Sequence, residues 1–132
     1  MVKALAHICF TVRDLDASLD FYEGNLGLTK AFDFINDQGV RFGVYLRVGG
    51  RSFIELFVGD SPAAEGGSYK HFCLEVEDVA AAVTTLRAAG VEVTDAVLGS
   101  DNSWQAWLSD PDGNRIELHG YTGESKQAPW LA

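Results

Sequence analysis

Two short segments of this chain recur in its second half, and each carries a histidine or a glutamate at a repeated position. Residues 7–15 align with residues 71–79 at an offset of 64, and residues 53–57 align with residues 115–119 at an offset of 62. Self-similarity of this kind is typical of one supersecondary unit that occurs twice. The sequence therefore predicts two copies of a small module.

The repeated polar residues are His7 and Glu55 in the first half and His71 and Glu117 in the second. Two imidazoles and two carboxylates form a donor set that suits one divalent ion. We therefore predict that these four residues ligate a metal, with Ni, Zn, Co or Mn as the cofactor and Fe as the less favoured choice. Polar residues tolerated on a wet sheet face are the alternative, which fits a lone histidine better than four matched residues.

Both halves show the same order of expected elements, which is a strand, a helix and then three strands. The expected strands cover residues 6–12, 29–34, 41–48, 52–58, 71–76, 91–98, 103–108 and 115–120. One helix begins after Asp14 or Asp16 and runs to about Glu23. The other begins after Asp78 and ends at Gly90. The predicted fold class is therefore α+β, with two βαβββ modules.

A chain of 132 residues fits one compact domain, which we expect to span residues 1–132. Module 1 covers about residues 4–58, and module 2 covers about residues 70–121. The polar, glycine-rich segment 59–69 is expected to link them. The tail, residues 122–132, either docks on a partner subunit or stays loose.

Alternation along the strands separates an apolar face, expected under the helices, from a face that carries the four predicted ligands. The residues expected to contact a substrate on this second face are Tyr45, Phe53, Phe57, Trp107, Gln105, Thr11 and His119. Tyr45 and Trp107 hold equivalent repeat positions and are expected to be cavity walls. His119 is expected to be a residue at the cavity rim, and the alternatives are a proton shuttle or a partner behind a metal ligand. Cys9 and Cys73 are interpreted as small thiols that line the cavity and not as ligands.

These residues together resemble the vicinal oxygen chelate superfamily, which includes glyoxalase I, extradiol dioxygenases, fosfomycin resistance enzymes and bleomycin-binding proteins. The resemblance covers nearly the whole chain. It rests on His7, on residues 14–22 followed by residues 26–28, on His71, and on the segment DPDGNRIEL at residues 110–118. It implies curved mixed sheets that form a metal-binding cup, and often a homodimer with shared active sites.

The complete set of two histidines and two glutamates is most similar to that of glyoxalase I. The resemblance implies a lyase or isomerase that acts on a small α-hydroxy carbonyl substrate through a metal-bound enediolate. Glu117 is the first choice of catalytic base and Glu55 the second. Glyoxalase I usually has an arginine where Thr11 stands and an asparagine near Gly59, so the chain departs from the pattern that holds glutathione.

Two other classes of protein stay open. A protein that binds an antibiotic or an aromatic metabolite would suit the aromatic walls, although such proteins usually lose the ligands that this chain keeps. A ring-cleaving dioxygenase usually has no ligand at the position of Glu55.

The charge balance narrows the choice of partners. The net charge is −9, which argues against nucleic acid and against an anionic membrane surface. No apolar run approaches the ~20 residues of a membrane span, and the first residues lack signal-peptide anatomy, so we expect a cytoplasmic protein. A small-molecule substrate remains compatible with this charge, because a bound cation dominates the potential at its own site.

Overall fold

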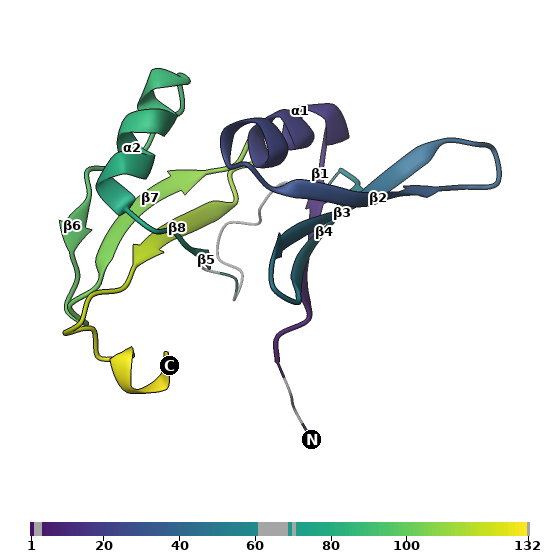
Figure 1. Cartoon of the computed structure of the whole chain (residues 1–132). Coiled ribbons are helices and arrows are strands. Elements are labelled where there is room, and N and C mark those ends of the chain that lie inside the picture. The colour runs from purple at the N-terminus through teal and green to yellow at the C-terminus, as the bar shows by residue number, and fades with distance from the viewer. Residues whose placement is uncertain (2–3, 61–68, 70, 132) are drawn as a thin grey trace. The chain divides into compact units, whose positions relative to one another are not determined.

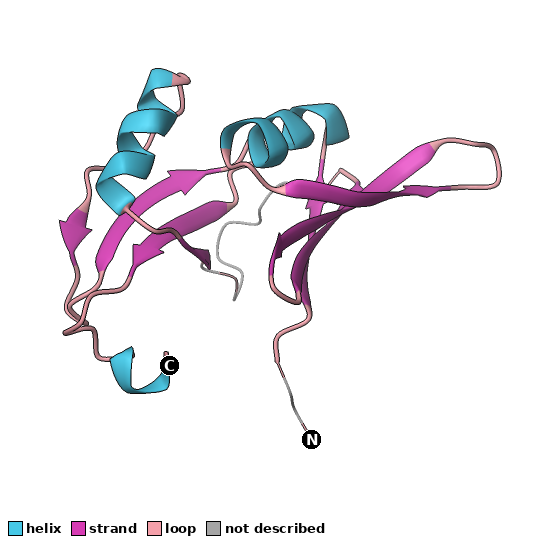
Figure 2. Cartoon of the chain, in the orientation of Figure 1, coloured by secondary structure: helices cyan, strands magenta, loops and turns pink. Residues whose placement is uncertain are grey.

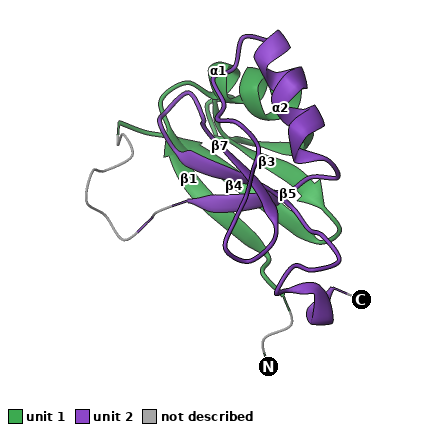
Figure 3. Ribbon diagram, turned by 90° about the vertical axis from the view of Figure 1, so that its left-hand side faces the viewer, with its two compact units in different colours: residues 1–65 green, residues 66–132 purple. Residues whose placement is uncertain are grey.

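The computed structural model describes residues 1, 4–60, 69 and 71–131 of the chain (Figure 1). These residues fall into two compact units, Met1–Glu65 and Gly66–Ala132, which Figure 3 shows in different colours. Each unit contains one four-stranded mixed sheet and its helical segment, so the predicted α+β fold class is confirmed. Most of the predicted linker lies outside the described residues.

The first unit contains β1 (His7–Val12), a helical segment, and the strands β2 (Thr29–Ile35), β3 (Arg41–Gly49) and β4 (Ser52–Val58). The strand order is β1-β4-β3-β2. β1 runs parallel to β4, and the other two pairs are antiparallel. These strands lie where the sequence predicts them, with their ends shifted by a single residue at most.

Asp14 starts the helical segment of the first unit. Its side chain accepts hydrogen bonds from two backbone N–H groups of the first turn, at 2.9 and 3.1 Å. It therefore caps α1 (Leu15–Leu19). The helix then widens into a π-helical segment, Asp20–Asn25, and does not end at Glu23 as predicted. Gly27 follows with a φ of +74°, a left-handed conformation that stops the segment.

The second unit contains β5 (Phe72–Glu75), α2 (Val79–Ala88), β6 (Val97–Leu98), β7 (Trp104–Ser109) and β8 (Arg115–Gly120). Its strand order, β5-β8-β7-β6, repeats that of the first unit. β5 runs parallel to β8, and the other pairs are antiparallel. Figure 2 distinguishes the helices of each unit from the strands.

The helix α2 begins and ends as predicted. Asp78 Oδ1 accepts a hydrogen bond from the Ala81 N–H at 2.9 Å, and Gly90 ends the helix with a φ of +80°. Val83 and Leu86 lie on its buried side. Within the described part of the chain, no helix is both long enough and apolar enough to cross a membrane.

The predicted strand over residues 91–98 is wrong in extent, because β6 covers only Val97–Leu98. Thr94 still lies beside β7, and its backbone N–H donates to the Trp107 carbonyl at 2.9 Å. In the opposite direction, the Trp107 N–H donates to the hydroxyl oxygen of Thr94 at 2.8 Å and not to its backbone carbonyl. A side-chain oxygen thus takes the place of a backbone carbonyl, and the regular ladder does not extend through Thr94.

One face of each sheet is apolar and packs against the helix of its own unit. α1 contacts β3 and β4, and α2 contacts β7 and β8. The buried strand residues predicted for this face are Phe10, Val12, Ile54, Leu56, Phe72, Leu74, Ile116 and Leu118. Ile8 and Val76 are half-buried. The opposite face of each sheet is left to the polar and aromatic side chains.

The C-terminal tail docks on its own unit, so the alternative of a loose tail is wrong for the described residues. Ser125 lies in the tail and Ser103 in the loop before β7. Their hydroxyl oxygens are 2.8 Å apart, and both serines are buried. A 3₁₀ helix, Ala128–Trp130, follows, and Trp130 is 80% exposed.

Replacing Asp78 with alanine should lower the free energy of unfolding by about 1 kcal/mol, because the first turn of α2 loses its capping carboxylate. Urea unfolding followed by circular dichroism would measure the loss. Glu77→Ala is the matched control, since Glu77 is also exposed and acidic but precedes the cap. Equal losses in the two variants would show that charge matters and capping does not.

Candidate metal centre

In the first unit, the parallel pairing of β1 with β4 brings His7 and Glu55 together. Cys9 lies opposite Glu55 in this register, and His7 lies two residues earlier on the same face. His7 Nε2 is 3.9 Å from Glu55 Oε1. The Tyr45 hydroxyl lies 3.2 Å from His7 Nδ1 and fixes the other side of the ring.

In the second unit, β5 and β8 repeat this arrangement. Cys73 lies opposite Glu117, and His71 directly precedes β5. His71 Nε2 is 3.1 Å from Glu117 Oε2. Glu117 is 9% exposed, so its carboxylate is largely shielded from water. Each unit therefore places one predicted imidazole beside one predicted carboxylate.

Both pairs have donor chemistry and spacing that suit a divalent metal. Two ligand atoms at about 2.1 Å from one ion, at angles of about 90–109°, lie about 3.0–3.4 Å apart. The His71–Glu117 separation of 3.1 Å falls in this range. The His7–Glu55 separation of 3.9 Å is wider and requires a small side-chain rotation. The residues present fit the metal that the sequence analysis predicts.

A different group of donors converges within the second unit. Cys73, Glu117 and His119 each offer one donor atom, and these atoms lie within 4.8 Å of one another. Burial raises the pKa of the Cys73 thiol to about 12, and the charge of Glu117 adds to the effect. At neutral pH the thiol therefore keeps its proton when no ion is bound.

His119 is not a rim residue, because it is 7% exposed. Its Nδ1 lies 3.2 Å from Glu117 Oε1, and its Nε2 lies 3.7 Å from Asp101 Oδ2. Gln127 in turn donates to Asp101 Oδ2 at 2.7 Å. Asp101 and Gln127 were not predicted as site residues. They lie in a loop and in the tail, where no periodic pattern exists to place them.

An aromatic stack covers part of the open sheet face in the first unit. Tyr45 stacks between Phe53 and Phe32, with ring centroids 5.0 and 4.9 Å away. Tyr45 and Phe53 were predicted to contact a substrate, whereas Phe32 was not. The alternation of Phe32 and Phe34 along β2 was the available signal. The stack offers a flat apolar surface beside His7.

Phe57 extends this aromatic surface toward the far end of β4. Its ring stacks on Phe42 with centroids 5.8 Å apart, and it also contacts Phe34. Phe57 lies flat over Gly43, where an added Cβ would come within 2.5 Å of the ring. The Phe57 ring can therefore lie on the sheet because residue 43 is a glycine.

Trp107 is the aromatic wall of the second unit. Its ring meets His71 edge to face at 4.7 Å, and the Arg115 guanidinium lies 4.1 Å from its centroid. An open groove of about 1060 Å³ runs beside Trp107 and Arg115. Among the described residues that line this groove, Trp107 contacts His71, whereas His71 and Glu117 are not part of the lining. Gln105, half-buried, lies two positions before Trp107 on β7.

Thr11 and Gly59 lie in close contact in the first unit. An added Cβ at Gly59 would lie 2.4 Å from the Thr11 methyl group. The Gly59 N–H also donates to the Val12 carbonyl at 2.9 Å, which holds the glycine against the end of β1. A larger residue at position 59 would therefore require the Thr11 side chain to move.

Comparison with known proteins agrees with this architecture. The model of the glyoxalase/bleomycin resistance protein/dioxygenase superfamily matches residues 4–118. A probable lactoylglutathione lyase from Vibrio cholerae is 31% identical over 121 residues, which cover 86% of this chain and 88% of that protein. The chain therefore belongs to the glyoxalase/bleomycin resistance protein/dioxygenase superfamily.

Solved structures with this fold differ in what they do. TnmS3, an antibiotic binding protein from Streptomyces sp. CB03234, has a TM-score of 0.75 and 26% identity, over 92% of this chain and 98% of its own. The fosfomycin resistance protein FosX from Listeria monocytogenes has a TM-score of 0.72 and 20% identity, over 92% and 96%. Enzymes and binding proteins thus share the fold, and side chains must decide between them.

Glu55→Gln should weaken the binding of Co²⁺ or Zn²⁺ by at least about 10–100-fold. Loss of a group that hydrogen-bonds to a metal ligand lowers metal affinity by this amount, and loss of the ligand itself should lower it at least as much. Competition against a chelator of known affinity would measure the change. The fold should persist, since Glu55 lies on the open face of β4. Glu92→Gln, an exposed glutamate outside the pairs, is the control. Parent-like affinity in Glu55→Gln would remove Glu55 from the ligand set.

Cys73 should react slowly with iodoacetamide in the metal-free protein at pH 7.5, because its raised pKa of about 12 leaves little thiolate. The rate should rise about tenfold per pH unit up to at least pH 10. A Cys9→Ser background isolates the signal of Cys73. A rate that reaches its plateau by pH 9 would contradict the assigned environment.

Proposed function

We propose that this protein is a metal-dependent lyase or isomerase that acts on small α-hydroxy carbonyl compounds. The observation that carries the proposal is the repeated pairing of an imidazole with a carboxylate. One pair lies on the open sheet face of each unit, with donor atoms 3.9 and 3.1 Å apart. A protein that only enclosed an apolar ligand would have no need of two such pairs.

His7, Glu55, His71 and Glu117 are the residues that would hold the ion. When bound, a divalent ion supplies Lewis-acid polarisation of the substrate oxygens. Glu117 is the proposed base, and it takes the proton from the carbon next to the carbonyl group. The former carbonyl carbon is then reprotonated by the Glu117 acid, whose proton exchanges with solvent, and the hydroxyl proton passes to the former carbonyl oxygen, so the atoms balance without an oxidant. Glu55 is the second choice for this role.

The walls of the site favour a substrate with a ring or another apolar portion. Tyr45, Phe53 and Phe57 present flat apolar surface on the first unit, and Trp107 does so on the second. Gln105 and Thr11 complete the proposed set of substrate-contacting residues, whereas His119, predicted to contact substrate, is buried and acts from behind Glu117.

Glutathione is not the favoured co-substrate. Thr11 stands where glyoxalase I usually has an arginine, and the chain has Gly59 near the position of its asparagine. The close contact between Thr11 and Gly59 supports this reading, since a larger amide side chain at position 59 would require the Thr11 side chain to move. The similarity to a probable lactoylglutathione lyase therefore supports the proposed type of reaction, and it does not support glutathione as the co-substrate.

Sequestration of an antibiotic or an aromatic metabolite is the second candidate function. The aromatic stack beside His7 favours it, as does the similarity in fold to TnmS3. Either function is compatible with a homodimer that shares its active sites, which the family resemblance implies. Trp130, at 80% exposure, is the proposed contact residue of such a dimer.

Solvent exchange tests the proposed reaction. The Co²⁺-loaded protein, incubated with α-hydroxy ketones in deuterated water, should introduce label at the carbon next to the carbonyl. NMR would detect the label, and Glu117→Gln should lose exchange by about 10²-fold or more, as expected for loss of a general base. Lack of exchange in the parent, together with tight binding of aromatic ligands, would favour sequestration. Oxygen consumption with a catechol would instead indicate a dioxygenase.

A further inference from the structure

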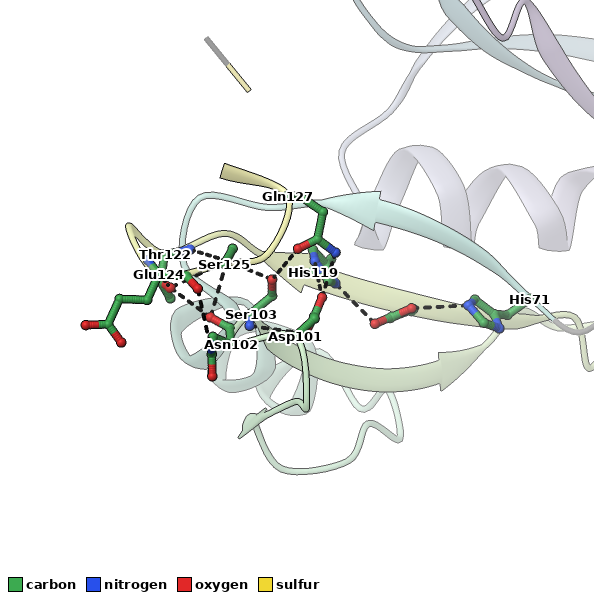
Figure 4. A network of polar contacts seen from close by, with 10 residues as sticks. His71, Asp101, Asn102, Ser103, His119, Thr122, Glu124, Ser125 and Gln127 are labelled. Carbon is green, nitrogen blue, oxygen red and sulfur yellow. Dashed lines mark hydrogen bonds and ion pairs between the residues drawn. The ribbon is translucent and has the colours of Figure 1, made fainter. Parts of the chain in front are cut away.

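A continuous series of polar contacts connects the C-terminal tail to Glu117 (Figure 4). Gln127 Nε2 donates to Asp101 Oδ2 at 2.7 Å. Asp101 Oδ2 lies 3.7 Å from His119 Nε2, and His119 Nδ1 lies 3.2 Å from Glu117 Oε1. The other carboxylate oxygen of Glu117 faces His71. Imidazoles and carboxylates alternate along this line, which lies wholly within the second unit.

Glu117 has its two oxygens engaged by two different imidazoles. Oε2 faces His71 Nε2 at 3.1 Å, and Oε1 faces His119 Nδ1 at 3.2 Å. Glu117 and His119 are 9% and 7% exposed, so water has little access to this contact. The position of His119 therefore determines how the Glu117 carboxylate is turned, and with it the direction in which Oε2 points.

One ring nitrogen of His119 lacks a hydrogen bond within the described part of the chain, which is uncommon for a buried polar atom. Its Nε2 is buried and has no hydrogen-bond partner among the described residues. The carboxylate of Asp101 lies opposite this nitrogen at 3.7 Å, too far for a hydrogen bond. A buried polar atom left in this state costs stability, so its presence calls for a role other than packing. The Asp101 carboxylate beside this nitrogen restricts how the ring can turn, and orienting the ring is such a role.

Asp101 is held in place from two directions. Gln127 binds its Oδ2, and the Ser103 N–H donates to its Oδ1 at 3.2 Å. The hydrogen bond from Gln127 lowers the pKa of Asp101, which keeps this side chain ionised opposite His119. The Lys126 N–H also donates to the Asp101 carbonyl at 2.9 Å. The tail thus fixes both the backbone and the side chain of Asp101.

The loop that carries Asp101 depends on the tail for its shape. Asn102 has a φ of 63°, a left-handed conformation that is uncommon for residues other than glycine. Its carbonyl accepts a hydrogen bond from Thr122 Oγ1 at 2.7 Å, and its side chain donates to the Glu124 carbonyl at 3.2 Å. The tail residues therefore stabilise the loop conformation that points Asp101 at His119.

We propose that Gln127, Asp101 and His119 are positioning residues that set the orientation of Glu117, so that the tail belongs to the site. This inference rests on the proposed function in so far as Glu117 is taken as a ligand and base. The contacts themselves do not depend on it. The segment 122–131 would then serve the site and not merely close the chain.

The test compares Gln127→Met with Glu124→Gln. Gln127→Met keeps the length of the side chain and removes the amide, whereas the Glu124 carboxylate points away from the network and serves as the control (Figure 4). Gln127→Met should lower the affinity for Co²⁺ by a few-fold to about 10-fold, less than loss of a direct partner of a ligand, because Asp101 and His119 lie between Gln127 and Glu117. It should also change the visible absorption of the bound ion. Glu124→Gln should change neither, and both variants should unfold near the parental temperature.

Imidazole NMR of the metal-free protein separates this inference from the proposed function. Gln127→Met should shift the ring signals of His119 and of His71, whereas Glu124→Gln should leave them in place. A parent that binds no Co²⁺ would refute the proposed function, and the ring shifts would then still decide the positioning role. Unchanged His119 and His71 signals in Gln127→Met would overturn the inference, whatever the metal affinity.

Discussion

The parallel pairing of the first strand with the last strand of each unit is the constraint on which the site depends. In the first unit it sets Cys9 opposite Glu55, and in the second it sets Cys73 opposite Glu117. Each glutamate then points to the same sheet face as the histidine two residues before the paired cysteine. Because side chains alternate along a strand, a slip of one residue would turn the glutamate into the apolar core. Ile54 and Ile116, which precede the glutamates, are buried. The slip would expose them to water, so their burial disfavours it.

The two halves have kept this geometry while their surroundings have diverged. Phe57 and His119 hold equivalent positions in the repeat, two residues after each glutamate. Phe57 joins an aromatic cluster, whereas His119 joins a buried polar series that reaches Gln127. The first unit therefore supplies mainly apolar wall beside its histidine–glutamate pair. The second supplies the orientation of its carboxylate, so the two glutamates are not chemically equivalent.

Much of the fold was predictable because two independent patterns agree. The repeat and the alternation of apolar residues along the strands assign the same side chains to the same sheet faces. The caps at Asp14 and Asp78 were readable from residue type, and both are confirmed. The strand over residues 91–98 was overestimated because a side-chain hydrogen bond of Thr94 is invisible to a pattern of apolar residues. The docking of the tail on its own unit could not be predicted from the sequence either, because it also depends on side-chain hydrogen bonds. It depends on short polar contacts between two irregular segments, such as that of Ser103 with Ser125.

Metal content tests the central claim most directly. Elemental analysis of protein purified without a histidine tag should find about one divalent ion of nickel, zinc, cobalt or manganese per chain. Such an ion is expected because two imidazole–carboxylate pairs at 3.9 and 3.1 Å offer a donor set that these metals favour. Protein that contains no metal, and takes up none when these ions are supplied, would contradict the account and leave the four residues as polar groups on an open sheet face.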